Sequence, residues 1–136
     1  MKMTIFLTLI LSIFAVSACQ TASTETASSA QTNEIKQISV EQAKQAFDAK
    51  DVQFIDVRTG GEYAGGHAPK AINFPLDSLQ KDLAKLDTDK PVYVICQTGR
   101  RSQKGSEILK KAGFKSIYNI NGGTSAWESA DFPMEK

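Results

Sequence analysis

Residues 91–102 read PVYVICQTGRRS, and this stretch decides the fold. Pro91 to Ile95 is a short, mostly apolar run, typical of a strand buried on both faces of a parallel sheet. The run ends on Cys96, and Ser102 to Ala112 then repeats apolar residues at helical spacing. Gly113 follows, and glycine commonly ends a helix. The stretch therefore predicts a strand, a loop that opens on a cysteine, and a helix.

The chain on either side repeats the same alternation. Ser39 and Gln42 fit a capping box, which predicts a helix that ends near Lys50. A second helix is expected to carry three leucines at positions 79, 83 and 86, with Asp77 or Ser78 as its N-cap. Further strands are expected at residues 52–57, 72–74 and 116–120, and a closing helix from residue 124. Such alternation with short links predicts an α/β domain with a mostly parallel sheet and helices on both faces.

Composition narrows the class of protein. With 136 residues, 41% hydrophobic and 23% charged, the chain has the size and the balance of a single globular domain. Its net charge of +1 gives no overall field for nucleic acid, so no nucleic-acid partner is expected. Two cysteines are too few for a disulfide scaffold, and no residues show metal-ligand spacing. We therefore expect no metal.

The amino-terminal residues 1–18 are predicted to be a signal peptide. A short positive start precedes 13 mainly apolar residues, 4–16, whereas a spanning helix needs about 20. Residues 16–19, Val-Ser-Ala-Cys, resemble the lipobox of bacterial lipoproteins, which implies cleavage before Cys19 and lipidation of its thiol. Ordinary signal cleavage after Ala18, which leaves Cys19 as a free thiol, is the alternative.

Residues 19–34 are expected to form a flexible tether, and residues 35–136 the folded domain. Beyond Cys19 the tether has no aromatic residue and no aliphatic residue larger than alanine, so it cannot offset the entropy of ordering. The lipoprotein resemblance implies a protein of the bacterial cell envelope that faces the periplasm and meets the membrane through its lipid anchor alone. Gln20, in place of an acidic residue, favours the outer membrane if the cell is Gram-negative.

Cys96 is the candidate nucleophile. Ligands of open α/β sheets bind beyond the carboxyl ends of the strands, where this cysteine lies. The loop after it can turn backbone amides inward as an anion-binding nest, and Gly99 permits the positive φ that such a loop needs. Residues 96–115 hold six basic side chains against one acidic, among them Arg100 and Arg101. These features favour a thiolate, whereas the alternative is a small, buried, inert cysteine.

Three groups of residues occur together in this chain: Ile55-Asp56-Val57-Arg58 with Glu62-Tyr63, Gly66-His67 and Ala71-Ile72-Asn73-Phe74-Pro75; the loop Cys96 to Ser102; and Gly122-Gly123 with Trp127. In this order they resemble the signatures of the rhodanese family of single-domain sulfurtransferases. Ala68 and Lys70 depart from the isoleucine and glycine usual beside that histidine, which affects the packing near His67. The resemblance spans nearly all of residues 35–136 and implies the rhodanese-like three-layer fold.

The resemblance also implies a chemistry. Cys96 would attack the outer sulfur of a donor such as thiosulfate, hold it as a persulfide, and release it to cyanide or a thiol, with no cofactor. Five loop residues would bind the substrate: Gln97, Thr98, Gly99, Arg100 and Arg101. Their backbone amides would stabilise the persulfide, and Arg100 or Arg101 would attract the donor's sulfonate.

Loop length distinguishes sulfur transfer from phosphate chemistry. Cysteine phosphatases of the dual-specificity cell-cycle type share the fold and place an arginine six positions after the cysteine. Here the sixth position is Ser102, and Arg101 lies five positions after Cys96. The tighter cradle suits a terminal sulfur atom better than a tetrahedral phosphoryl group.

The remaining signature residues are expected to support the site. Asp56 and Arg58 could touch the substrate, but an ion pair that fixes neighbouring loops is the favoured interpretation. Glu62 could be a partner of Arg58. His67 invites a general-base role, yet an ionised thiolate needs no base, so a structural role is favoured.

Three other functions stay open from the sequence. The chain could be a non-catalytic persulfide carrier or partner-docking module, a phosphatase or arsenate reductase on the same fold, or a surface lipoprotein that only binds. The expected partners are a small sulfur donor and a small acceptor, and the sequence indicates no particular protein partner.

Overall fold

The computed structural model describes residues 33–136. The predicted signal peptide, Cys19 and most of the tether lie outside the described residues. Within residues 33–136, none of the helices combines the length and the apolar character that crossing a bilayer requires.

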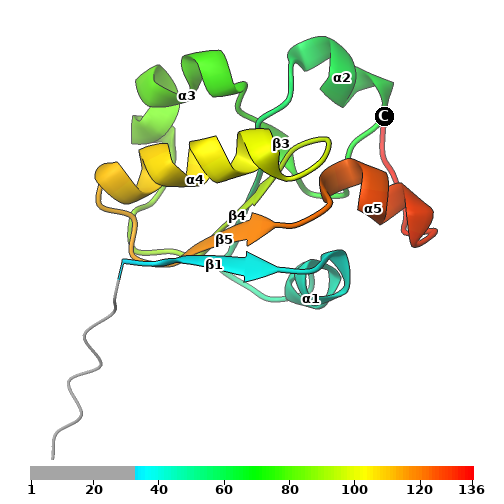
Figure 1. Cartoon of the computed structure of the whole chain (residues 1–136). Coiled ribbons are helices and arrows are strands. Elements are labelled where there is room, and N and C mark those ends of the chain that lie inside the picture. The colour runs from blue at the N-terminus through cyan, green and yellow to red at the C-terminus, as the bar shows by residue number, and fades with distance from the viewer. Residues whose placement is uncertain (1–32) are drawn as a thin grey trace, which may run out of the picture.

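Five parallel strands form one sheet in the order β1-β5-β4-β2-β3 (Figure 1). They are β1 Ile35–Ile38, β2 Gln53–Asp56, β3 Ile72–Asn73, β4 Val92–Ile95 and β5 Ile117–Ile120. β4, which leads to the cysteine loop, lies in the middle of the sheet. The predicted parallel α/β architecture is confirmed.

Helices cover both faces of the sheet. They are α1 Val40–Ala46, α2 Gly60–Gly65, α3 Leu76–Asp82 with a 3-10 turn at Leu83–Lys85, α4 Arg100–Lys111 and α5 Gly123–Ser129. α3 packs against α4, and α1 contacts α5. Figure 1 shows α3 and α4 above the sheet and α1 below it, so the expected three-layer arrangement is present.

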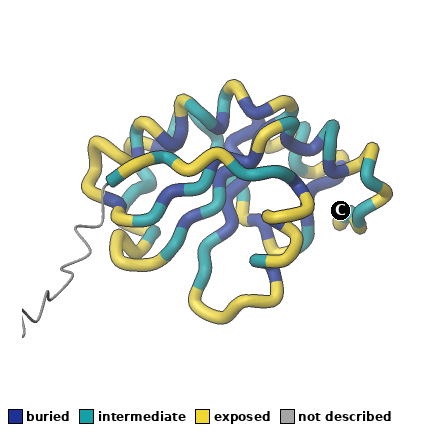
Figure 2. Tube along the Cα trace, turned by 60° about the horizontal axis from the view of Figure 1, so that its bottom comes forward, coloured by how far each residue is buried: buried dark blue, intermediate teal, exposed yellow. Residues whose placement is uncertain are grey.

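The core consists of two clusters, one on each face of the sheet. Val92 and Val94 of β4 pack with Leu79 and Leu109 of α3 and α4, whereas Ile95 belongs to the cluster of α1 and α5. This alternation follows from the two-residue period of a strand. In Figure 2 the buried residues lie along the strands and the inner faces of the helices.

Helix starts differ in part from those predicted. The capping box is confirmed, because the Gln42 amide donates to Ser39 Oγ at 3.3 Å and the Ser39 amide donates to Gln42 Oε1 at 2.9 Å. Neither Asp77 nor Ser78 caps α3, because the helix already starts after Pro75, whose backbone leaves the strand and turns into the helix. α4 likewise starts before the predicted Ser102, and α1 ends at Ala46, before Lys50.

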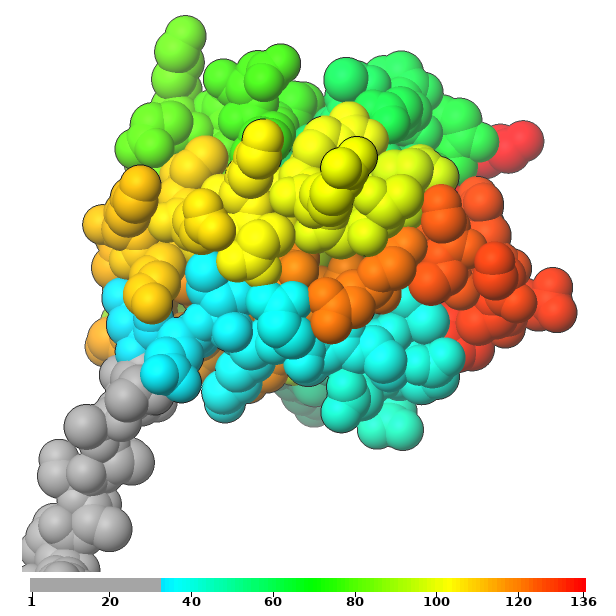
Figure 3. All heavy atoms as spheres, viewed as in Figure 1, coloured from blue at the N-terminus to red at the C-terminus, as the bar shows by residue number. Residues whose placement is uncertain are grey.

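Two elements, β1 and α2, were not predicted from the sequence. β1 is a four-residue edge strand that lies on the surface in Figure 3, so its burial pattern is weak. α2 holds three glycines in six residues, and glycine is a poor helix former. α2 instead depends on a capping box between Thr59 and Glu62, and this helix proves to shape the site.

Candidate active site

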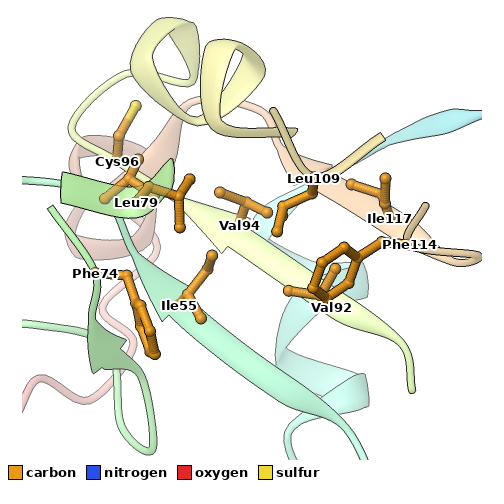
Figure 4. Packing of buried hydrophobic residues seen from close by; sticks show 10 residues of the cluster. Ile55, Phe74, Leu79, Val92, Val94, Cys96, Leu109, Phe114 and Ile117 are labelled. Carbon is orange, nitrogen blue, oxygen red and sulfur yellow. The ribbon is translucent and has the colours of Figure 1, made fainter. Parts of the chain in front are cut away.

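Cys96 follows the last residue of the central strand and is 1% exposed. Figure 4 shows it at one end of the row of buried side chains that fills the α3 and α4 side of the sheet. The parallel strands all end at this edge, where α4 and α5 begin (Figure 1). The structure therefore places the cysteine where the topology predicts a ligand to bind.

Polar groups of the following loop and of the start of α4 surround the sulfur. The Gly99 amide donates to Cys96 Sγ at 3.1 Å, and Ser102 Oγ lies 3.4 Å from the same atom. Burial raises the pKa of the Cys96 thiol, but the Ser102 side chain and the amides of Ser102, Thr98 and Gly99 lower it, and the net pKa lies below its ordinary value. The loop thus favours a thiolate without a histidine.

The active loop is fixed from behind by the start of α5. The Thr124 amide donates to the Cys96 carbonyl at 2.8 Å, and the Ser125 amide donates to the Gln97 carbonyl at 3.1 Å. At Gly123, a Cβ atom would lie 2.1 Å from the Cys96 carbonyl oxygen, so no larger residue fits there without moving the loop. The Gly122-Gly123 motif is therefore a support of the loop backbone.

Gln97 turns its side chain toward this support. Its Nε2 donates to Ser125 Oγ at 2.8 Å, and its Oε1 accepts from Thr124 Oγ1 at 3.2 Å. In contrast, the neighbouring Thr98 and Arg100 are exposed. Of the five predicted binding residues, Gly99 is therefore buried, Gln97 and Arg101 are half-buried, and Thr98 and Arg100 are exposed.

Arg101 is held by Glu62 in a bidentate pair. Its two terminal nitrogens donate to the two carboxylate oxygens at 2.9 and 2.6 Å. The Thr59 hydroxyl and amide also donate to Glu62, at 2.8 and 3.0 Å. Hydrogen bonds from Arg101 first, and from Thr59, hold the pKa of Glu62 far below its usual range. The prediction that Glu62 pairs with Arg58 is wrong, because α2 carries Glu62 to the start of α4.

Arg58 forms a buried ion pair with Asp56, as the favoured interpretation expected. Arg58 Nη2 donates to Asp56 Oδ2 at 2.7 Å and to the Gly66 carbonyl at 2.7 Å. Arg58 Nη1 also reaches Gln97 Oε1 at 3.5 Å. The side chains are 5% and 0% exposed. The pair therefore connects the end of β2, the end of α2 and the active loop.

His67 stands in a separate packing arrangement. Its ring stacks on Tyr63 with centroids 3.7 Å apart, and its Nδ1 lies 3.0 Å from the Tyr63 carbonyl oxygen. Its backbone pairs with Glu135 in an antiparallel bridge. Within residues 33–136, the ring's polar contacts are with these two residues. The arrangement joins α2 to the carboxyl-terminal segment.

The two departures beside His67 are accommodated locally. Ala68 is buried in the core of the α1 and α5 side. Lys70 adopts a left-handed φ of 62°, where glycine has no strain, and its Nζ donates to the Phe47 carbonyl at 2.7 Å. The backbone turn expected of a glycine is thus kept.

Sequence reasoning missed the roles of Glu62 and of the Ser102 hydroxyl. The spacing Thr59-x-x-Glu62 is itself a capping-box signature and could have predicted α2. The contact of Glu62 with Arg101 depends on tertiary packing, since 39 residues separate the two. Across the described part of the chain, no three histidine, cysteine or acidic residues gather as metal ligands would.

Comparison with known proteins agrees with this geometry. A family model described as a rhodanese-like domain matches residues 39–130. The thiosulfate sulfurtransferase GlpE of Shewanella oneidensis is 36% identical over 96 residues, which cover 71% of this chain and 95% of that protein. A Bacillus subtilis protein, YrkF, provisionally named a sulfur carrier protein, is 35% identical over 101 residues. These cover 74% of this chain and 55% of YrkF.

Solved structures show the same likeness. A rhodanese-like domain protein from Staphylococcus aureus aligns with a TM-score of 0.63 at 34% identity, covering 68% of this chain and 91% of that one.

Proposed function

The chain belongs to the rhodanese-like domain family, and from that premise we propose that it is a sulfurtransferase that works through a persulfide on Cys96. Its donor is a sulfane compound such as thiosulfate, and its acceptor is cyanide or a thiol. The sulfurtransferase GlpE, of which this chain covers nearly the full length, supports the reaction class.

In the first step the Cys96 thiolate attacks the outer sulfur of thiosulfate. A bond forms between the two sulfurs while the bond from the outer sulfur to the sulfonate sulfur breaks, and sulfite leaves with that electron pair. The product is an anionic persulfide on Cys96. The amides that already point at Sγ can then stabilise the terminal sulfur.

In the second step the acceptor attacks the terminal sulfur. Cyanide forms a carbon–sulfur bond, the sulfur–sulfur bond breaks, and Cys96 leaves as the thiolate with thiocyanate as product. No proton or electron is added from outside. His67 has no part in either step, in keeping with its contacts to Tyr63 and Glu135.

The observation that carries this proposal is the short loop converging on a thiol of lowered pKa. Six residues run from Cys96 through Arg101, one fewer than in the phosphate-binding loop of the related phosphatases. In addition, the side chain of Arg101 turns to Glu62 rather than closing over the sulfur as a phosphate ligand. A small, singly bonded sulfur is the better occupant.

The test is to incubate the purified protein with thiosulfate and measure released sulfite, thiocyanate formed after cyanide addition, and the mass of the protein. The proposal expects turnover and one added sulfur atom on Cys96. Cys96→Ala should show neither. Hydrolysis of an aryl phosphate without any sulfur adduct would contradict the proposal.

A persulfide carrier is the second candidate, and the likeness to YrkF favours it. The same assay separates the two functions. A carrier takes up one sulfur per Cys96 and stops, whereas an enzyme continues to form thiocyanate while thiosulfate and cyanide last.

We also propose that residues 1–18 are removed and that Cys19 carries a lipid, with residues 19–34 joining the anchor to the domain in the cell envelope. The sequence at residues 16–19 supports this proposal. Metabolic labelling with a fatty acid should mark the protein, and Cys19→Ala should abolish the label. Cys96→Ala is the matched control and should keep it.

A further inference from the structure

The contact between Glu62 and Arg101 stands at the rim of the active loop. Both side chains are about one-third exposed, at 35% and 36%. Arg101 is the second residue of α4 and lies two residues after Gly99, whose amide donates to the sulfur. A carboxylate and a guanidinium therefore meet where a donor must approach.

We propose that Glu62 is a specificity-determining residue that cancels the charge of Arg101 and so disfavours doubly charged thiosulfate relative to singly charged organic sulfur donors. This inference rests on the proposed sulfurtransferase function. The singly charged donors are of the thiosulfonate class, with methanethiosulfonate as the probe.

Coulomb's law gives the reason for discrimination by charge. A free guanidinium at the rim attracts a dianion about twice as strongly as a monoanion at the same distance. In the pair, each terminal nitrogen of Arg101 donates one N–H to Glu62, so this edge of the guanidinium is occupied and its charge is offset by the carboxylate. The field of the Cys96 thiolate also contributes to raising the pKa of Arg101, after the larger effect of Glu62. Arg101 lies five positions after Cys96, at the start of the helix that follows the loop, so its charge acts on an anion at the sulfur.

The other cations near the loop differ from Arg101 in their surroundings. Arg58 is engaged by Asp56 in the interior. Arg100 is exposed, and no carboxylate among residues 33–136 pairs with it. The rim therefore holds one guanidinium free to attract donors and one that Glu62 controls.

Glu62 is held in place by more than Arg101. Two hydrogen bonds from Thr59 fix its carboxylate, which stays ionised because its pKa is strongly lowered. Glutamine is the other residue that capping boxes use at this position. Glu62→Gln therefore removes the charge while it keeps the start of α2.

Both donors give the same persulfide by balanced steps. Methanethiosulfonate loses its outer sulfur to the Cys96 thiolate and leaves as methanesulfinate, just as thiosulfate leaves as sulfite. The reacting sulfur and the product on the protein are identical. A difference in response to a variant therefore reports on the charge of the remainder of the donor.

The experiment measures kcat/KM for thiosulfate and for methanethiosulfonate with cyanide as acceptor. In Glu62→Gln, we expect the ratio of thiosulfate to methanethiosulfonate to rise about three- to tenfold, mainly through a lower KM for thiosulfate. The increase should shrink at high salt, since rim charges are screened. Glu62→Asp, which keeps the charge, should keep most of the wild-type ratio.

Asp89→Asn is the matched control. It removes a carboxylate paired with Lys115 before the amino end of β4, at the opposite edge of the sheet from Cys96. Its ratio should stay at the wild-type value. If Glu62→Gln leaves the ratio unchanged, or lowers kcat/KM for both donors by the same factor, the inference is overturned while the proposed sulfurtransferase function stands. If neither donor loads wild-type Cys96, the proposed function itself fails.

Discussion

Two ion pairs flank the active loop, and they differ in burial although their chemistry is the same. Asp56 and Arg58 are 0% and 5% exposed and connect three segments of the interior. Glu62 and Arg101 are about one-third exposed and stand at the rim. Water screens the rim pair but not the interior pair. The interior pair therefore sustains the structure, and the rim pair can adjust donor binding.

Breaking the interior pair should have the largest effect. Arg58→Met leaves the Asp56 carboxylate buried without its partner, which costs about 3–5 kcal/mol of stability. We expect a corresponding fall in the free energy of unfolding, measured by urea denaturation. Sulfur transfer should also be lost, because Gln97 of the active loop loses its contact with Arg58.

Asp56→Asn combined with Arg58→Met is the control for this change. It removes the unpaired charge, so it should be more stable than Arg58→Met alone. Equal stability of the single and double variants would show that the buried charge is not the cause.

The support from α5 should give the next largest effect. Gly123→Ala places a methyl group where only 2.1 Å separates it from the Cys96 carbonyl oxygen, at a φ of 58°. We expect a loss of about 1–3 kcal/mol from overpacking, and at least a tenfold fall in kcat/KM because the loop must move. Gly61→Ala is the matched control, since nothing lies within 4 Å of its added methyl group.

The Ser102 hydroxyl should have a smaller effect, visible in the pH profile. Ser102→Ala removes one of the hydrogen bonds that lower the Cys96 pKa, so the pKa should rise. The thiolate then forms at higher pH, and the rate of persulfide formation should shift to higher pH with it. The measurement is the alkylation rate of Cys96 against pH.

Ser102→Thr, which keeps a hydroxyl, should hold the profile near that of the wild type. If Ser102→Ala leaves the profile where it was, the backbone amides of Thr98 and Gly99 suffice without the hydroxyl.

The same contrast explains what could be predicted from the sequence. The buried strand before Cys96 and the loop with Gly99 follow from local pattern, and these were predicted correctly. The Asp56 and Arg58 pair could also be anticipated, because two residues in one short segment can meet with little dependence on the rest of the fold.

The rim could not be predicted in this way. Glu62 lies in a glycine-rich helix that local propensity disfavours, and its partner Arg101 comes from another helix. Which carboxylate meets which guanidinium depends on how α2 and α4 lie at the end of the sheet. Charge pairing at the rim is therefore a property of tertiary packing, whereas the nucleophile and its loop are a property of local sequence.

The smallest effect on stability is expected at the rim. Glu62→Gln removes an ion pair that is about one-third exposed, which is worth about 0.2–1 kcal/mol near neutral pH. The pKa of Glu62 is lowered on folding, so this stabilisation is present above the ordinary carboxylate pKa and is lost as pH falls below it. Urea denaturation of both proteins should therefore show a small difference at pH 7 that shrinks in acid. If the free energies of unfolding differ by several kcal/mol, or if the difference grows as pH falls, the Glu62 and Arg101 pair supports the structure as the Asp56 and Arg58 pair does. A change in donor selectivity in Glu62→Gln would then reflect a distorted loop rather than an altered charge.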